Sequence, residues 1–205
     1  KKDESKLQEL YDLASNRREE SPLIADLSLL SRQEAQEKFP DLQGFERLLY
    51  ASGGARVEGS LLTETLVKAS KAELVEKKVR LTVEGEQLLV DGRSFDCVIL
   101  AVGAWLGEIL QPLGYETDVR PQKGQLRDFK LAEKTDDYPV VMPEGELDII
   151  PFPAGKVSVG ASHENNQGFD LTVDKTVLDQ LQQEAETYLP RLSKAEILGE
   201  RVGTR

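Results

Sequence analysis

The chain has 205 residues, enough for one large domain or two small ones, and its 39% hydrophobic content is ordinary for a globular protein. Its formal charge of -11 argues against binding to nucleic acid or to an anionic membrane surface, because both need a surplus of lysine and arginine. The single cysteine, Cys97, excludes an internal disulfide and favours a cytoplasmic location, and no apolar run is long enough to span a membrane.

The first part of the chain predicts two helices. Apolar residues recur every three or four positions over residues 4–20, which indicates an amphipathic helix that ends at Pro22. We expect Ser31 to cap a second, short helix, with Glu34 completing a capping box. This helix should end before Pro40, because proline disfavours a helical residue in front of it.

A glycine-containing loop follows at residues 51–59. Its glycines, Gly53, Gly54 and Gly59, could cradle a phosphate, but a cluster this loose is more often a plain turn. The pattern alone therefore favours the turn.

A third helix and a hairpin are expected next. Ser60 has the position of an N-cap for a helix over residues 61–70, with Leu62 and Leu66 on its buried side. From Val79 onward apolar and polar residues alternate, and Gly85 then turns the chain, which predicts a half-exposed hairpin.

The segment 96–102 is apolar without alternation, which is typical of a strand covered on both faces in a parallel sheet. Gly103 closes it, and a helix containing Trp105 is expected to begin at once, so the pattern predicts a βα unit. Ligands of open α/β sheets bind at the carboxyl ends of strands, where the small residues Gly103 and Ala104 would admit a cofactor. The pattern alone favours a plain core unit over a binding site.

After Gly114 the expected strands become short and are separated by turn residues. They fall at 124–127, 140–142, 147–150 and 156–161, which indicates an antiparallel sheet. A long amphipathic helix should follow over residues 174–189 and end at Pro190. The predicted fold class is mixed α+β, with a largely antiparallel sheet and helices packed on it.

Few residues suit catalysis by a side chain. With one histidine and one cysteine, a zinc site is nearly excluded. His163 is the candidate for a hydrolase triad, but no nucleophile elbow accompanies it, which favours a surface or pocket-lining histidine. Four arginines near predicted sheet edges could pair with a carboxylate, although each would ordinarily be solvated: Arg120, Arg127, Arg201 and Arg205.

Four stretches together resemble the D-amino-acid oxidase and glycine oxidase family of FAD-dependent oxidoreductases. They are residues 54–59 with the helix after them; 95–105, similar to the family's D-x-V-(V/I)-x-A-x-G-x-W; 120–126, similar to P-x-(K/R)-G-Q; and 150–170, similar to its P-x-x-x-G-x-x-x-V-G-x-T-x-E hairpin. Each is modest alone, but their order and spacing are fairly specific and cover the chain from about Leu30 to Arg205.

The resemblance implies a two-domain enzyme that oxidises the C–N bond of a small amine or amino acid by hydride transfer to FAD. Residues 1–44 would form a helical segment packed on the substrate domain, residues 45–114 part of a Rossmann-like FAD domain, and residues 115–205 the substrate domain. Amine, D-amino-acid, glycine and sarcosine oxidation all fit this architecture.

The same resemblance implies two sets of site residues and no side chain acting as a catalytic base. The FAD contacts would be Val79, Gly103 and Ala104. On the substrate side, residues 202–205 resemble the family's G-x-R-P turn, so Arg205 would bind the substrate carboxylate, with Met142 and His163 lining the pocket.

The family's dinucleotide-binding βαβ unit would precede Lys1, and its last strand and helix would follow Arg205. We therefore expect the chain to be an internal piece of the enzyme that is flavin-free and inactive by itself. A non-catalytic binding module on the same scaffold is the alternative, and a small hydrolase or transferase using His163 is a weaker third interpretation.

Overall fold

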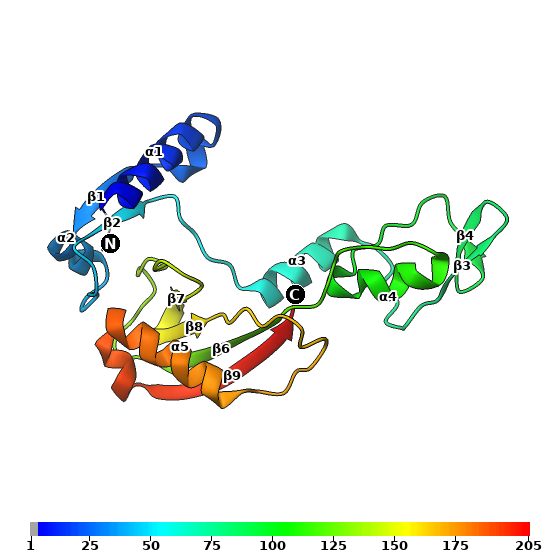
Figure 1. Ribbon diagram of the computed structural model, residues 1–205. Coiled ribbons are helices and arrows are strands. Elements are labelled where there is room, and N and C mark those ends of the chain that lie inside the picture. The colour runs from blue at the N-terminus through cyan, green and yellow to red at the C-terminus, as the bar shows by residue number, and fades with distance from the viewer. Residues whose placement is uncertain (1–3) are drawn as a thin grey trace. The chain divides into compact units, whose positions relative to one another are not determined.

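Two separate packing units account for residues 4–205, the part of the chain that this computed structural model describes (Figure 1). The first takes in the described residues up to Arg56 together with Gly124–His163 and Thr172–Gly203. The second takes in Val57–Lys123, Glu164–Leu171 and Thr204–Arg205. Each unit is thus assembled from segments that are far apart in the sequence.

The first unit is built on a four-stranded sheet in the order β7-β8-β6-β9 (Figure 1). Its strands are β6 (Lys123–Lys130), β7 (Asp148–Pro151), β8 (Lys156–Gly160) and β9 (Glu196–Thr204). β8 runs antiparallel to both β6 and β7, so the predicted antiparallel sheet and the α+β class are confirmed. The predicted strand at 140–142 is reduced to one bridge, between Val141 and Ile149.

Helix α5 (Lys175–Tyr188) packs against β8, as the pattern over residues 174–189 predicts. The Asp174 side chain caps it by accepting hydrogen bonds from the backbone N–H groups of Thr176 and Val177. A 3-10 turn, η5 (Pro190–Lys194), follows. Alternate side chains of the sheet face inward and form one core with α5, η5 and the residues that follow α2: Phe39, Leu42, Phe129, Leu131, Leu147, Ile149, Val157, Val159, Ala185, Leu189 and Leu192.

The N-terminal part of this unit contains both predicted helices, α1 (Glu4–Glu20) and α2 (Arg32–Lys38). The expected capping box is present, since the side chain of Ser31 accepts from the backbone N–H of Glu34 and the Glu34 carboxylate accepts from the backbone N–H of Ser31.

Two strands in this part were not predicted, β1 (Leu27–Ser31) and β2 (Arg47–Ala51). They pair directly in antiparallel orientation, and helix α2 lies between them in the sequence. The 3-10 turn η1 (Pro22–Ile24) precedes them. Each strand is short and mostly apolar, and short apolar segments do not by themselves separate a strand from a buried helical segment.

The second unit contains the predicted hairpin and several short helical segments. Its elements are α3 (Gly59–Ser70), β3 (Leu81–Glu84), β4 (Gln87–Val90), β5 (Arg93–Ser94), η2 (Gly103–Trp105), α4 (Leu106–Leu110) and η3 (Gln111–Leu113). β3 and β4 pair antiparallel, which confirms the hairpin, although its first strand begins at Leu81 rather than Val79.

The predicted buried strand at 96–102 is wrong. These residues form no strand, Cys97 is exposed, and Ile99 is 85% exposed. A strand needs neighbours for its backbone hydrogen bonds, and none of the sheets among residues 4–205 includes this segment.

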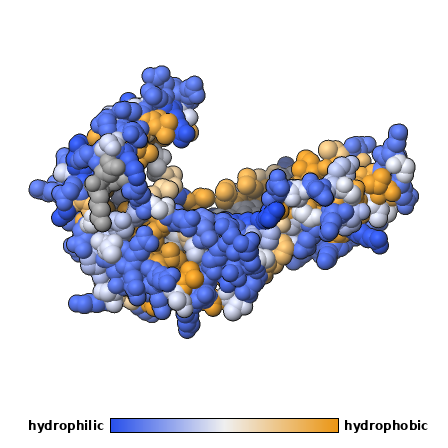
Figure 2. All heavy atoms as spheres, in the orientation of Figure 1, coloured by the Kyte–Doolittle hydropathy of each residue, from blue (hydrophilic) through white to orange (hydrophobic). Residues whose placement is uncertain are grey.

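The expected details of helix α3 are also wrong. Glu58 rather than Ser60 is its N-cap, and Leu62 and Leu66 are exposed because no described sheet covers them. Figure 2 shows such apolar atoms in orange on the surface of the second unit. Among the residues that the structure describes, no helix is both long and apolar enough to cross a membrane.

A buried carboxylate joins strands on the sheet face opposite α5. Asp128 accepts hydrogen bonds from Arg201 at 2.8 Å and from Ser158 at 2.5 Å, and the Lys156 ammonium lies 3.2 Å away. Burial raises the pKa of Asp128, but the hydrogen bonds from Arg201, Ser158 and Lys156 outweigh burial and hold this pKa below its ordinary value.

The core predicts that replacing leucine by alanine has a different effect on stability at a buried and at an exposed position. Leu192 is fully buried in the core, whereas Leu23 is 88% exposed. Leu192→Ala should lower the free energy of unfolding by about 2–5 kcal/mol, because it removes buried methyl groups and leaves a cavity. Leu23→Ala should change it by less than about 0.5 kcal/mol. Urea unfolding of both variants measures the difference, and equal effects would contradict the described core.

Asp128 predicts how stability depends on pH. Because its pKa in the folded state lies below the unfolded value of about 3.9, its ionised form stabilises the fold above that pH. This stabilisation is lost as the pH falls through the folded-state pKa. Asp128→Asn should therefore cost about 1–2 kcal/mol at neutral pH and flatten the loss of stability between about pH 5 and pH 2.

Urea unfolding across this pH range provides the measurement. Asp137→Asn, a matched change at an exposed position of the same unit, serves as the control and should retain the wild-type pH dependence. An unchanged pH dependence in Asp128→Asn would show that the Asp128 cluster does not stabilise the fold.

Candidate functional site

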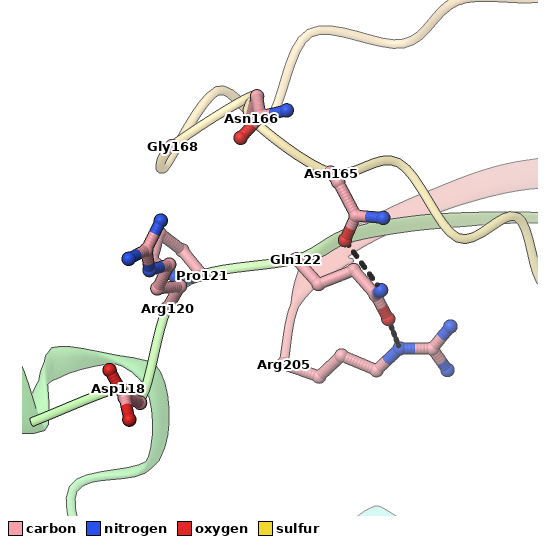
Figure 3. A pocket seen from close by; sticks show the side chains of 8 residues that line it. All are labelled: Asp118, Arg120, Pro121, Gln122, Asn165, Asn166, Gly168 and Arg205. Carbon is pink, nitrogen blue, oxygen red and sulfur yellow. Dashed lines mark hydrogen bonds between the residues drawn. The ribbon is translucent and has the colours of Figure 1, made fainter.

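An open pocket of about 730 Å³ lies within the second unit (Figure 3). Polar side chains dominate its lining, which consists of Asp118, Arg120, Pro121, Gln122, Asn165, Asn166, Gly168 and Arg205. Residues from three distant parts of the sequence therefore meet here. Arg120 and Arg205 belong to the four arginines that the sequence analysis named as possible carboxylate ligands.

Backbone pairing brings these three parts together. The N–H of Gln122 donates to the carbonyl of Arg205, and the N–H of Arg205 donates to the carbonyl of Gln122, both at 2.9 Å. On the other side, Lys123 and Glu164 exchange two hydrogen bonds of 3.0 and 2.8 Å. The segment 122–123 is thus the central one of three paired segments, which places the Arg205 and Asn165 backbones on either side of it.

The side chains above this backbone form a chain of hydrogen bonds (Figure 3). Arg205 donates from Nε to Oε1 of Gln122 at 3.0 Å, and Gln122 donates from Nε2 to Oδ1 of Asn165 at 2.9 Å. The guanidinium of Arg205 is therefore attached to the amide groups of the pocket.

The loop that carries Asn165 is attached to the rest of the second unit at two further points. The Phe169 ring stacks on Trp105, with 4.9 Å between ring centroids. Asp170 lies 3.6 Å from Nζ of Lys123, whose side chain is 4% exposed. Because a buried ammonium favours a charged partner, this contact also holds the loop beside residue 123.

The four candidate arginines have different surroundings. Arg127 is buried in the first unit and donates to Asp179, Gln182 and Glu200 at 2.6–2.8 Å. Burial lowers the pKa of Arg127, but its hydrogen bonds to Asp179 and Glu200 outweigh burial and raise this pKa. Arg201 donates to Asp128, as described above. Arg127 and Arg201 thus bind carboxylates of the protein itself, and the pocket contains Arg120 and Arg205.

The residues expected to contact FAD lie in the second unit. Gly103 begins η2 with φ +52°, and no atom lies within 4 Å of the place where a side chain would start. Ala104 is buried and lines a second hollow of about 680 Å³ together with Arg120 and Phe169. Val79 is 44% exposed. The open backbone at Gly103 and the small Ala104 side chain fit the edge of a dinucleotide. None of the three residues has a side chain that can bind a phosphate.

Met142 and His163 belong to the first unit and do not line the pocket of Figure 3. Met142 is 75% exposed, and Nδ1 of His163 lies 2.9 Å from a carboxylate oxygen of Glu146. The pairing of His163 with an exposed carboxylate provides no nucleophile for a hydrolase triad.

The glycine loop at 51–59 has a structural explanation. A side chain at Gly53 would begin 1.8 Å from the carbonyl oxygen of Leu23, and its N–H donates to the carbonyl of Ile24. This close backbone contact, rather than a phosphate, accounts for the glycine. Within residues 4–205, no group of three or more His, Cys, Asp or Glu side chains is placed to hold a metal ion.

The predicted Rossmann fingerprint preceding Lys1 lies outside the described residues.

Sequence reasoning missed Gln122 and Asn165 as members of the pocket. The only sequence signal for Gln122 is its place in the stretch 120–126, whose P-x-(K/R)-G-Q pattern leaves that position unspecified. Asn165 could be assigned only once the pairing of Lys123 with Glu164 was known.

Comparison with curated proteins finds several oxidoreductases. The chain is 35% identical over 213 residues to an uncharacterised oxidoreductase, YurR, of Bacillus subtilis, covering 99% of the chain and 57% of the relative. It is 34% identical over 209 residues to a glycine oxidase of Pseudomonas putida, covering 94% of the chain and 54% of the relative. The chain thus spans just over half the length of the curated relatives that it matches.

Solved structures include similar folds. The crystal structure of iminodiacetate oxidase from Chelativorans sp. BNC1 matches with a TM-score of 0.89 and 31% identity, over 99% of this chain and 57% of that one. Glycine oxidase from Bacillus cereus matches with a TM-score of 0.84 at 20% identity, over 100% of this chain and 57% of that one, which shows the fold alone.

The family model of FAD-dependent oxidoreductases called DAO matches residues 1–205, the whole chain. This match confirms the resemblance drawn from the four sequence stretches and agrees with the mixed fold of helices and antiparallel sheets. FAD is the cofactor of this family. The chain belongs to the DAO family of FAD-dependent oxidoreductases.

Proposed function

We propose that this chain is part of an enzyme that oxidises the C–N bond of a small amino acid or related amine that carries a carboxylate. Two kinds of relatives support the proposal: glycine oxidases, and an iminodiacetate oxidase that is similar over nearly the whole chain. Both named substrates combine an amine with a carboxylate. The enzyme would thus need a cationic group to hold the carboxylate while the amine faces the flavin.

The position of Arg205 is the observation that carries the proposal. Its guanidinium lies in a polar pocket among amide side chains, and a guanidinium can hold a carboxylate through two parallel hydrogen bonds. Arg120, which lines the same pocket, adds a second positive charge. We assign Arg205 as the group that binds the substrate carboxylate.

Bound FAD would supply the chemistry by accepting a hydride from the carbon that bears the amine. The backbone at Val79, together with Gly103 and Ala104, would contact the cofactor, because the Gly103 backbone is open and Ala104 is small. No side-chain base is required if the amine arrives uncharged, so the task of these residues is to bind and orient.

Met142 and His163 are proposed as substrate-side residues of the first unit, although neither lines the pocket that contains Arg205. We also propose the division into an N-terminal segment at 1–44, in which strand β1 accompanies the helices, an FAD-domain portion at 45–114 and a substrate domain at 115–205. In this division the 205-residue chain by itself holds only part of the flavin site and is flavin-free and inactive.

Flavin binding tests the cofactor assignment. The 205-residue chain, mixed with FAD and then dialysed, should lose the visible absorbance of oxidised flavin. A longer protein, in which this chain is extended to the full length of its relatives, should retain this absorbance. The extended protein would have a larger surface that binds the flavin. Failure of that longer protein to bind FAD after reconstitution would refute the assignment. Binding of an amino acid without flavin reduction would instead favour a non-catalytic module.

Arg205→Met in the longer, flavin-loaded protein tests the substrate assignment. The KM for glycine or iminodiacetate should rise by about 30-fold to 1000-fold, because the carboxylate loses a charged hydrogen-bonding partner. Arg93→Met removes an exposed arginine of the same unit and should leave KM unchanged. Steady-state kinetics measure both, and equal KM values in the two variants would exclude Arg205 as the carboxylate ligand.

A further inference from the structure

Gln122 lies between Arg205 and Asn165 and contacts both through its side-chain amide (Figure 3). The direction of these hydrogen bonds is fixed by chemistry. Arginine can only donate, so the amide must turn its oxygen towards Arg205 and its NH₂ group towards Asn165. Asn165 then accepts with its own oxygen. The three side chains therefore form one ordered chain of donors and acceptors.

The backbone dictates this arrangement. Gln122 and Arg205 exchange both of their backbone hydrogen bonds, so they are direct partners in an antiparallel pair, and their side chains project from the same side. The pairing of Lys123 with Glu164 brings the next residue, Asn165, to the opposite flank of Gln122. Gln122 is thus placed where one side chain can reach both neighbours.

The contact from Gln122 selects which edge of the Arg205 guanidinium faces a ligand. A guanidinium can hold a carboxylate through the edge that includes Nε or through the edge formed by its two Nη atoms. Gln122 accepts from Nε, which fixes the plane of the guanidinium and with it the direction in which the Nη edge faces. An arginine side chain has many rotamers, and fixing one before the ligand arrives avoids part of the entropic cost of binding.

We propose that Gln122 is a positioning residue, supported by Asn165, that orients Arg205 to receive the carboxylate of an amino-acid substrate. This inference rests on the proposed function, in which Arg205 binds that carboxylate. Gln122 itself does not contact the reacting atoms. Its effect should therefore appear in the affinity for substrates that carry a carboxylate and not in the chemical step.

Gln122→Met in the flavin-loaded protein removes the acceptor while preserving the length of the side chain. We expect KM for glycine to rise about fivefold to twentyfold, because one hydrogen bond to a charged group is lost, and kcat to stay within about threefold of wild type. For glycinamide, which has no carboxylate, KM should not change. Asn165→Ala should shift KM for glycine in the same direction by a smaller factor.

The matched control is Gln167→Met, the same substitution at an exposed position of the loop that carries Asn165. It should leave both substrates unaffected. A general disturbance of the fold in Gln122→Met would instead raise KM for glycine and glycinamide alike, and that result would overturn the proposal.

A measurement that does not depend on activity uses the 205-residue chain. Proton exchange at Nε of Arg205, followed by NMR, should be several-fold faster in Gln122→Met than in wild type, because the hydrogen bond protects this proton. Gln167→Met should leave the exchange rate unchanged. Equal exchange in all three proteins would contradict the orienting contact.

The kinetic outcomes separate the two proposals. If Arg205→Met leaves KM for glycine unchanged, the proposed function and the role of Gln122 both fail. If Arg205→Met raises KM but Gln122→Met does not, Arg205 binds the carboxylate without help from Gln122, and only the positioning role is overturned. A rise in both variants, restricted to the substrate with a carboxylate, supports both proposals.

Discussion

The pairing of residues 122–123 with two separate segments is the constraint on which the candidate site depends. Gln122 pairs with Arg205 on one side, and Lys123 pairs with Glu164 on the other. Backbone hydrogen bonds of this kind fix both distance and register, so side chains from three remote stretches meet without any one of them being long or unusual. The pocket is therefore a consequence of strand pairing, and its polar side chains take their positions from the backbone.

The arginines near the four-stranded sheet differ in the groups that they contact. Arg127 and Arg201 point to opposite faces of the four-stranded sheet, and each meets carboxylates of the protein. Removing Arg127 would take away a cationic partner of Asp179 and Glu200, and removing Arg201 would leave Asp128 with Lys156 alone, so both arginines serve the fold. Arg205 continues β9 beyond its last residue and donates to the side-chain amide of Gln122 in the pocket. This contact with a pocket residue distinguishes Arg205 from the other two.

Much of the fold could be predicted because its signals are local. The capping box at Ser31, the hairpin turn at Gly85 and the amphipathic helix ended by Pro190 each depend on residues a few positions apart. The segment 96–102 shows the limit of such reasoning. Its apolar composition predicts a covered strand, yet a strand forms only where a neighbour supplies hydrogen bonds, and composition does not provide that neighbour. β9 was missed because its glycines and charges weaken the strand pattern.

The sequence by itself determined the family, the α+β class, the identity of FAD as the family's cofactor and the set of arginines from which a carboxylate ligand would come. These depend on motif order and residue type, which are readable along the chain. Only the tertiary structure showed that Arg127 and Arg201 bind carboxylates of the protein itself and that Gln122 and Asn165 lie beside Arg205. The contacts of Gln122 need the register of pairing between segments separated by 43 and 83 positions, and no local pattern encodes contacts at such separations.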